Sequence, residues 1–153
     1  MSHSDDLADA FLTASRALIG LAVRSIEAAP VDVTVAQHRV LVLLAARGDL
    51  TIRDLADRLG VNPSNATRYC DRLQRLGLVH RARSVEDGRM VQVSLTQEGQ
   101  ALVTAVTERR RQEIDQVLER MTGPDAIRVV AALRAFNRAA GEVEDRDWAA
   151  SFW

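Results

Sequence analysis

The chain has 153 residues, a formal net charge of −1 and 47 % hydrophobic residues, which fits one domain with a substantial core. No apolar run is long enough to span a bilayer, no signal peptide is evident, and a single cysteine excludes a disulfide framework. We therefore expect a cytoplasmic protein without metal or cofactor. No nucleophile–base pair, metal triad or phosphate-binding glycine loop can be recognised, so an enzyme is not expected.

Two helices are predicted before the middle of the chain. Apolar residues recur at helical spacing over residues 7–26 and predict a long first helix that ends near Ala29-Pro30. Thr34 is a suitable N-cap for a second helix, which should end at Gly48. The buried side of this second helix is expected to carry Val40, Leu41 and Leu44.

Two short helices joined by a tight turn are predicted next. Thr51 can cap a helix over residues 52–59, and Gly60 can adopt the left-handed conformation that ends it. Asn62 can cap the following helix, with Pro63 in the first turn, where its missing N–H costs nothing. The buried stripe of that helix would consist of Ala66, Cys70, Leu73 and Leu76.

The outward face of this following helix is polar at its start and rich in arginine further along. Short polar groups at a helix N-terminus can meet base edges in the DNA major groove, and guanidinium groups can meet base edges or phosphates. The candidate DNA-binding residues on this face are Ser64, Asn65, Thr67, Arg68, Arg72 and Arg75. Asp71 is also expected to face outward.

A basic β-hairpin is predicted directly after these helices. Residues 79–83 and 90–95 alternate at period two, and an Asp-Gly pair lies between them. Arg83 on the first strand is a further candidate DNA contact, and Arg89 beside the turn suits a narrow, negative minor groove. Helix, turn, helix and basic hairpin together predict a winged helix-turn-helix over residues 34–95.

The net charge of −1 does not argue against DNA binding, because the charge is unevenly distributed. From Asn62 to Arg83 there are five arginines and one aspartate, a local charge of +4. Exposed charges are screened beyond about 8 Å at physiological salt, so DNA responds to this local field. All basic residues of the chain other than histidine are arginines.

Two more helices are predicted after the hairpin. Thr96 can cap a helix over residues 97–121, Gly123-Pro124 would break it, and a last helix should run from Asp125 to about residue 144. Their apolar stripes exceed what a small winged helix can cover. The stripe residues are Val106, Ile114, Val117, Leu118, Val129, Leu133 and Phe136.

These stripes predict a homodimer in which two-fold symmetry pairs the two DNA-reading parts with two half-sites. The dimerisation part would comprise residues 5–29 and 97–145. The tail at 146–153 contains Trp148, Phe152 and Trp153, and we expect it to dock on the dimerisation helices rather than fray.

The stretch from about Thr34 to Leu102 resembles the MarR family of bacterial transcription regulators. The matching motifs are N-P-S-N-A-T-R, D-R-L-Q-R-L-G-L-V-H-R, E-D-G-R and V-S-L-T-Q-E-G-Q-A-L, in this order. The resemblance implies a mostly α-helical fold with a small β-wing, and a repressor that binds a pseudo-palindromic operator in double-stranded DNA as a homodimer. It also implies that Ser64, Thr67 and Arg68 approach the major groove, and that Asp87 and Arg89 shape the wing and place the arginine in the minor groove.

Three alternatives remain open. The family commonly responds to small aromatic or phenolic compounds, and His38 lies near its ligand pocket; we interpret His38 as a partly buried structural residue, with a ligand contact as the alternative. Cys70 is interpreted as a core residue, with a thiol redox sensor as the alternative, although the redox members of the family carry their reactive cysteine near the N-terminus. A winged-helix protein-interaction module is the alternative to DNA binding, but it would favour an acidic or apolar recognition face.

Overall fold

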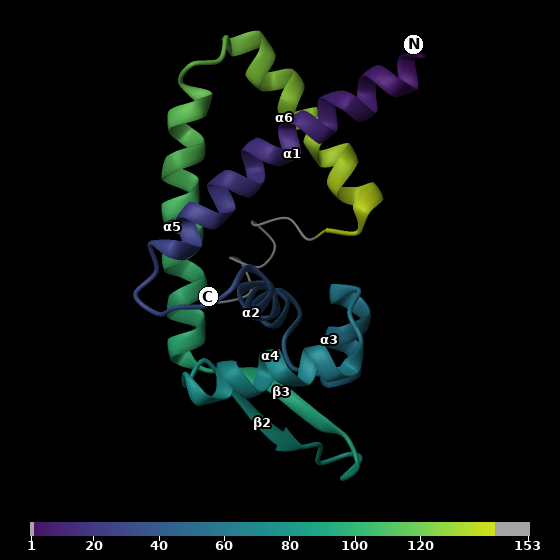
Figure 1. Cartoon of the computed structure of the whole chain (residues 1–153), viewed down its shortest axis with the longest axis vertical. Coiled ribbons are helices and arrows are strands. Elements are labelled where there is room, and N and C mark those ends of the chain that lie inside the picture. The colour runs from purple at the N-terminus through teal and green to yellow at the C-terminus, as the bar shows by residue number, and fades with distance from the viewer. Residues whose placement is uncertain (1, 143–153) are drawn as a thin grey trace.

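The computed structural model describes residues 2–142, so the predicted tail with Trp148, Phe152 and Trp153 lies outside the described residues. The fold is mostly helical with a small three-stranded sheet, as the sequence predicts (Figure 1). The elements are α1 (His3–Glu27), α2 (Val35–Arg47), β1 (Leu50–Thr51), α3 (Ile52–Leu59), α4 (Pro63–Arg75), β2 (Val79–Arg83), β3 (Val91–Leu95), α5 (Gln97–Leu118) and α6 (Gly123–Ala140).

The predicted starts of α2, α3, α4 and α5 are confirmed, and polar side chains fix them. Thr34 and Thr51 each accept a hydrogen bond from the backbone N–H three residues later, and the side chains of Gln37 and Asp54 accept a bond from the backbone of the cap in return. Asn62 caps α4 in the same way, with its Oδ1 2.9 Å from the backbone nitrogen of residue 65. Such caps satisfy N–H groups that a helix would otherwise leave unpaired.

The last helix begins and ends earlier than the sequence predicts. Gly123 and Pro124 form its first turn instead of a break before it, because a proline in the first turn sacrifices no hydrogen bond. Gly141 has a left-handed backbone conformation, with φ of 71°, so the helix ends at Ala140, short of the predicted end near residue 144.

The sheet contains one strand that the sequence pattern missed. Its order is β1-β3-β2, and both pairings are antiparallel. Val93 of β3 pairs with Leu50 on one side and Arg81 on the other, and its side chain is fully buried. β1 is only two residues long, so no alternation could reveal it; the pairing with β3 creates it.

The main core lies in the lower part of Figure 1, where α2, α3, α4, the sheet and the start of α5 meet. Val106 belongs to this core with 1 % of its surface exposed, which corrects its predicted place on the dimerisation stripe. Side chains from each surrounding element are buried in it, among them Leu41, Leu55, Leu73, Val93 and Val103.

α6 and the first half of α1 lie above this core in the view of Figure 1. α6 contains no buried residue, and its Ile127, Leu133 and Phe136 are exposed. Phe11 of α1 stacks on Phe136 with ring centroids 4.5 Å apart. Leu7, Leu18 and these two rings line an apolar groove of about 720 Å³ between the helices, here called the α1–α6 groove.

None of the helices within residues 2–142 is both long enough and apolar enough to cross a membrane.

The start of α5 is held against the segment that links α4 to β2. The Thr96 hydroxyl donates to the carbonyl oxygen of Gly77 at 2.7 Å, and the Thr96 N–H donates to that of Leu78 at 3.1 Å. Gly99 is buried at this contact, and a Cβ on it would lie 2.1 Å from the Leu78 carbonyl oxygen. Only glycine therefore allows α5 to approach this closely. α5 ends at Leu118 rather than at the predicted Met121.

We expect Gly99→Ala to lower the free energy of unfolding by about 1 to 3 kcal/mol, the usual cost of overpacking, because the methyl group meets backbone that cannot turn aside. Gly88→Ala is the matched control, since a Cβ there meets nothing within 4 Å. Urea denaturation of both variants decides the matter. Equal stability of the two variants would contradict the close approach.

Candidate nucleic-acid interface

α4 separates its residues into a core side and a polar side. Ala66, Cys70 and Leu73 face the core with no exposed surface, as the helical spacing predicts. On the other side, Ser64, Arg68, Arg72 and Arg75 are exposed, while Asn65 and Thr67 are half-buried.

The polar groups at the start of α4 are oriented by bonds within the same turn. Oδ1 of Asn62 accepts from the backbone N–H of Asn65 at 2.9 Å and from the Ser64 hydroxyl at 2.7 Å. The Thr67 hydroxyl donates to the Pro63 carbonyl at 2.9 Å. Both hydroxyl protons are thus engaged, and the hydroxyl oxygens keep lone pairs that can accept from an outside donor.

The tip of the hairpin is ordered by Asp87. Its Oδ1 accepts from the backbone N–H of Arg89 at 3.0 Å, and its carbonyl accepts from the N–H of Met90 at 3.0 Å. The Ser84 N–H closes the loop onto the Met90 carbonyl at 2.7 Å. Asp87 therefore acts on Arg89 through the backbone, and the Arg89 side chain is exposed.

One arginine of this surface forms an ion pair that sequence reasoning missed. Arg81 of β2 lies 2.6 Å from a carboxylate oxygen of Asp71, and its Nε donates to Oε1 of Gln74 at 2.6 Å. Both partners are on α4. The pairing joins residues on different elements, so neither helical nor strand periodicity could show it.

The other arginines of α4 and the hairpin are not neutralised. None of the ion pairs between described residues involves any arginine of α4 or of the hairpin other than Arg81. With the Arg81–Asp71 pair cancelling internally, the positive charge of this face remains on Arg68, Arg72, Arg75, Arg83 and Arg89.

Cys70 is a buried core residue, as predicted. It has no exposed surface, and burial raises the pKa of its thiol to about 11. The thiolate is the nucleophile in cysteine oxidation, so a buried thiol with a raised pKa is poorly suited to redox sensing.

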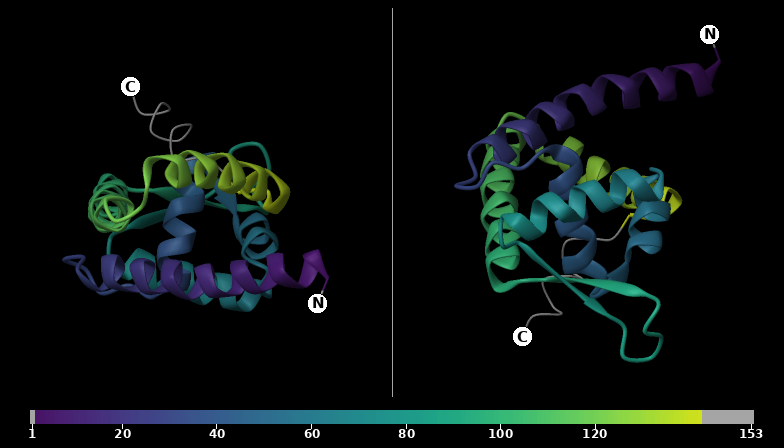
Figure 2. Two further views of the ribbon diagram at one scale, coloured as in Figure 1. Left: turned by 90° about the horizontal axis from the view of Figure 1, so that it is seen from above. Right: turned by 60° about the horizontal axis from the view of Figure 1, so that its bottom comes forward.

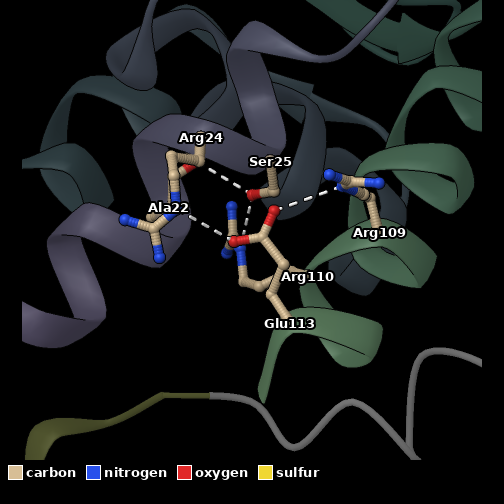
Figure 3. A network of polar contacts seen from close by, with 6 residues as sticks. All are labelled: Ala22, Arg24, Ser25, Arg109, Arg110 and Glu113. Atoms are coloured by element: carbon tan, nitrogen blue, oxygen red, sulfur yellow. Dashed lines mark hydrogen bonds and ion pairs between the residues drawn. The ribbon is translucent and has the colours of Figure 1, made fainter. Parts of the chain in front are cut away.

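A polar network joins α1 to α5 (Figure 3). Glu113 accepts from Nε of Arg24 and from Nε of Arg109, both at 3.2 Å. The buried Ser25 hydroxyl accepts from Nε of Arg110 at 3.0 Å and donates to the Ala22 carbonyl.

His38 of α2 is more deeply buried than predicted, with only 5 % of its surface exposed. Burial, followed by the charges of Arg110 and Arg39, lowers the pKa of His38 from the usual 6.5 to about 4. Its Nε2 is buried without a hydrogen-bond partner among the described residues. Within the same residues, no group of three or more histidine, cysteine, aspartate or glutamate side chains could hold a metal ion.

His38 should make the fold less stable as the pH falls. Its pKa is lower in the folded than in the unfolded chain, so between about pH 6.5 and pH 4 the unfolded chain binds the extra proton. We expect this residue to remove about 2 kcal/mol of stability between pH 7 and pH 5. Denaturation of the wild type and of His38→Gln at both pH values measures it. Equal losses in the two proteins would show that His38 does not carry the effect.

The geometry defines a class of protein: a helix-turn-helix whose second helix presents unpaired arginines, followed by a basic hairpin, is a winged helix-turn-helix. Residues 31–90 match the family model described as the MarR family. The chain is also 31 % identical over 114 residues to the HTH-type transcriptional repressor MdtR of Bacillus subtilis, covering 74 % of this chain and 73 % of MdtR.

Solved structures agree. The crystal structure of RV1404 from Mycobacterium tuberculosis has a TM-score of 0.87 and 36 % identity, covering 95 % of this chain and 99 % of RV1404. BpsR of Bordetella bronchiseptica, whose DNA binding is regulated by 6-hydroxynicotinic acid, shares the fold with a TM-score of 0.66 and 21 % identity, covering 90 % of this chain and 96 % of BpsR. This chain belongs to the MarR family of DNA-binding transcription regulators, which are not enzymes.

Proposed function

We propose that the protein is a homodimeric repressor that binds a pseudo-palindromic operator on chromosomal DNA in the cytoplasm. The observation that carries this proposal is the set of five unpaired arginines on α4 and the hairpin. A protein-interaction surface would favour acidic or apolar groups here. Repression is supported by the likeness to the repressor MdtR.

In this proposal α4 is the recognition helix and lies in the major groove. Ser64 and Thr67 already donate their protons within the helix, so they face DNA as acceptors and suit the amino groups of adenine or cytosine. Arg68 lies in the same half of the helix and suits guanine. Asn65 is a further base contact, and the remaining arginines, Arg72, Arg75 and Arg83, meet base edges or phosphates.

The hairpin is the wing, and its tip lies in the minor groove. Asp87 holds the backbone of Arg89 in place by accepting a hydrogen bond from its N–H. The conformation of the turn, and not an ion pair, therefore determines where the Arg89 guanidinium group begins. A narrow minor groove concentrates negative potential and attracts such a group.

We propose that DNA binding is the work of residues 34–95, and dimerisation that of residues 5–29 and 97–145. The support is the unburied α6 and the α1–α6 groove, whose apolar side chains lack cover in one chain. A second copy that supplies the same surfaces would cover them and would place two recognition helices one helical turn of DNA apart.

Phe136→Glu should shift the protein from dimer to monomer, because it places a charge in the α1–α6 groove. Val85→Glu is the control: this valine is fully exposed on the wing, and the variant should remain dimeric. Sedimentation velocity measures both. A dimer that survives Phe136→Glu at low micromolar concentration would contradict the proposed interface.

We also propose that a small aromatic or phenolic effector relieves repression by changing the spacing of the two recognition helices. The DNA binding of BpsR is regulated by a small aromatic molecule, 6-hydroxynicotinic acid. The unpartnered Nε2 of His38 and the neighbouring Arg110, at the junction of α1, α2 and α5, support a contact with a polar group of such a ligand. Cys70 does not support redox control, because its thiol is buried.

DNA binding should depend steeply on salt. The unpaired arginines of two chains neutralise several phosphates, so the log–log slope of affinity against salt should be on the order of −5 or steeper. The probe is a DNA fragment from upstream of the protein's own gene, measured by fluorescence anisotropy. Absent binding at low salt, or binding that does not change with salt, would contradict the proposed function.

Two substitutions separate the recognition helix from the wing in the same assay. Arg68→Ala should flatten the preference among operator variants, with a loss of roughly 5- to 150-fold at the base that it reads. Arg89→Ala should weaken all of these sequences and reduce the salt slope by roughly one for each wing. Identical, sequence-independent losses would mean that α4 is misplaced in the groove.

A further inference from the structure

The Arg81–Asp71 pair lies where the wing leaves the body of the protein. Residues 82–91 of the hairpin include no buried side chain, whereas Val79 and Val93 nearby are buried. Arg81 is therefore the outermost side chain of β2 with a hydrogen bond to α4 among the described residues. Beyond it, the hairpin extends past α4 on its own (Figure 2).

We infer that Arg81 is a positioning residue, which fixes the angle between wing and recognition helix instead of contacting DNA, and that Asp71 holds it in this role. The inference rests on the proposed function. Asp71 and Gln74 are neighbours one turn apart on α4, and both contact Arg81. Arg68 and Arg75 are exposed and take no part in the ion pairs between described residues.

The geometry suits a guanidinium group in particular. Arg81 uses two different nitrogens, Nη2 toward Asp71 and Nε toward Gln74, so its planar fork is fixed against rotation. A single point contact would let the hairpin swing. The side chains of Arg81 and Asp71 are 28 % and 40 % exposed, so the pair is partly shielded from solvent and removing it should not unfold the core.

The pair also withholds a positive charge from the DNA. The Asp71 carboxylate compensates the Arg81 guanidinium, so this arginine should not add to the counterion release that makes binding salt-dependent. An operator must contact α4 and the wing at the same time, so its binding requires a fixed angle between them. Random DNA is bound through electrostatic contacts alone, so its binding does not require this angle.

The double variant Asp71→Asn/Arg81→Ala and the single variant Arg83→Ala form the matched test, because the first removes the pair without changing the net charge and the second removes an unpaired arginine from the same strand. The double variant should lower operator affinity about tenfold, with little effect on random DNA and an unchanged salt slope. Arg81→Ala alone leaves the Asp71 carboxylate uncompensated, so it should weaken random DNA as well. Arg83→Ala should weaken both DNAs and reduce the slope by roughly one for each wing. Arg81→Lys, which keeps the charge but not the fork, should fall between wild type and Arg81→Ala.

Asp71→Asn gives the opposite signature. It frees the Arg81 charge, so random DNA should bind more tightly with a steeper salt slope, while the preference for operator falls. The double variant Asp71→Asn/Arg81→Ala should lose no more operator preference than the worse single variant, because one link is removed only once.

A double variant that weakens operator and random DNA alike and lowers the salt slope, as Arg83→Ala does, would overturn the inference and make Arg81 a phosphate contact. Losses of operator preference that add in the double variant would overturn it as well. Circular dichroism and melting temperature confirm folding. If the variants at Arg81 are unfolded, Gln74→Ala removes one arm of the link without changing the net charge, and it should lower operator preference with an unchanged salt slope. Failure of the wild type to bind DNA would instead contradict the proposed function.

Discussion

The close contact between Gly99 and the Leu78 carbonyl joins the DNA-reading surface to the rest of the chain. Leu78 comes between α4 and β2, and Gly99 is in the first turn of α5. Because Thr96 bonds to the same segment, recognition helix, wing and α5 start from one rigid corner. The start of α5 therefore cannot shift without changing the segment between α4 and β2 that it contacts.

The sequence predicted most helices because their starts depend on local chemistry. Thr34, Thr51, Asn62 and Thr96 cap the helices that they were expected to cap. What could not be predicted depends on chain segments that meet only after folding. β1 exists through its pairing with β3, and Val106 is buried because α5 packs against α1 and α2 of the same chain.

In the candidate site, too, features set by local sequence could be predicted and features that depend on distant segments could not. The exposed side of α4 follows from a period of 3.6, so the outward arginines could be named in advance. The pairing of Arg81 with Asp71 and the depth of His38 could not, since each requires knowing which helix or strand lies opposite. Besides burial, two arginines lower the pKa of His38, Arg110 on α5 and Arg39 on the same helix, and only Arg39 is close in sequence.

The positive face contains arginine where many DNA-binding surfaces mix arginine and lysine. A guanidinium group stays protonated throughout the physiological pH range and cannot be acetylated as a lysine amine can. The strength of this face is thus constant with respect to both acidity and acetylation of the chain. With the charge of these arginines constant, the angles between α4, the hairpin and α5 decide how the positive groups are presented.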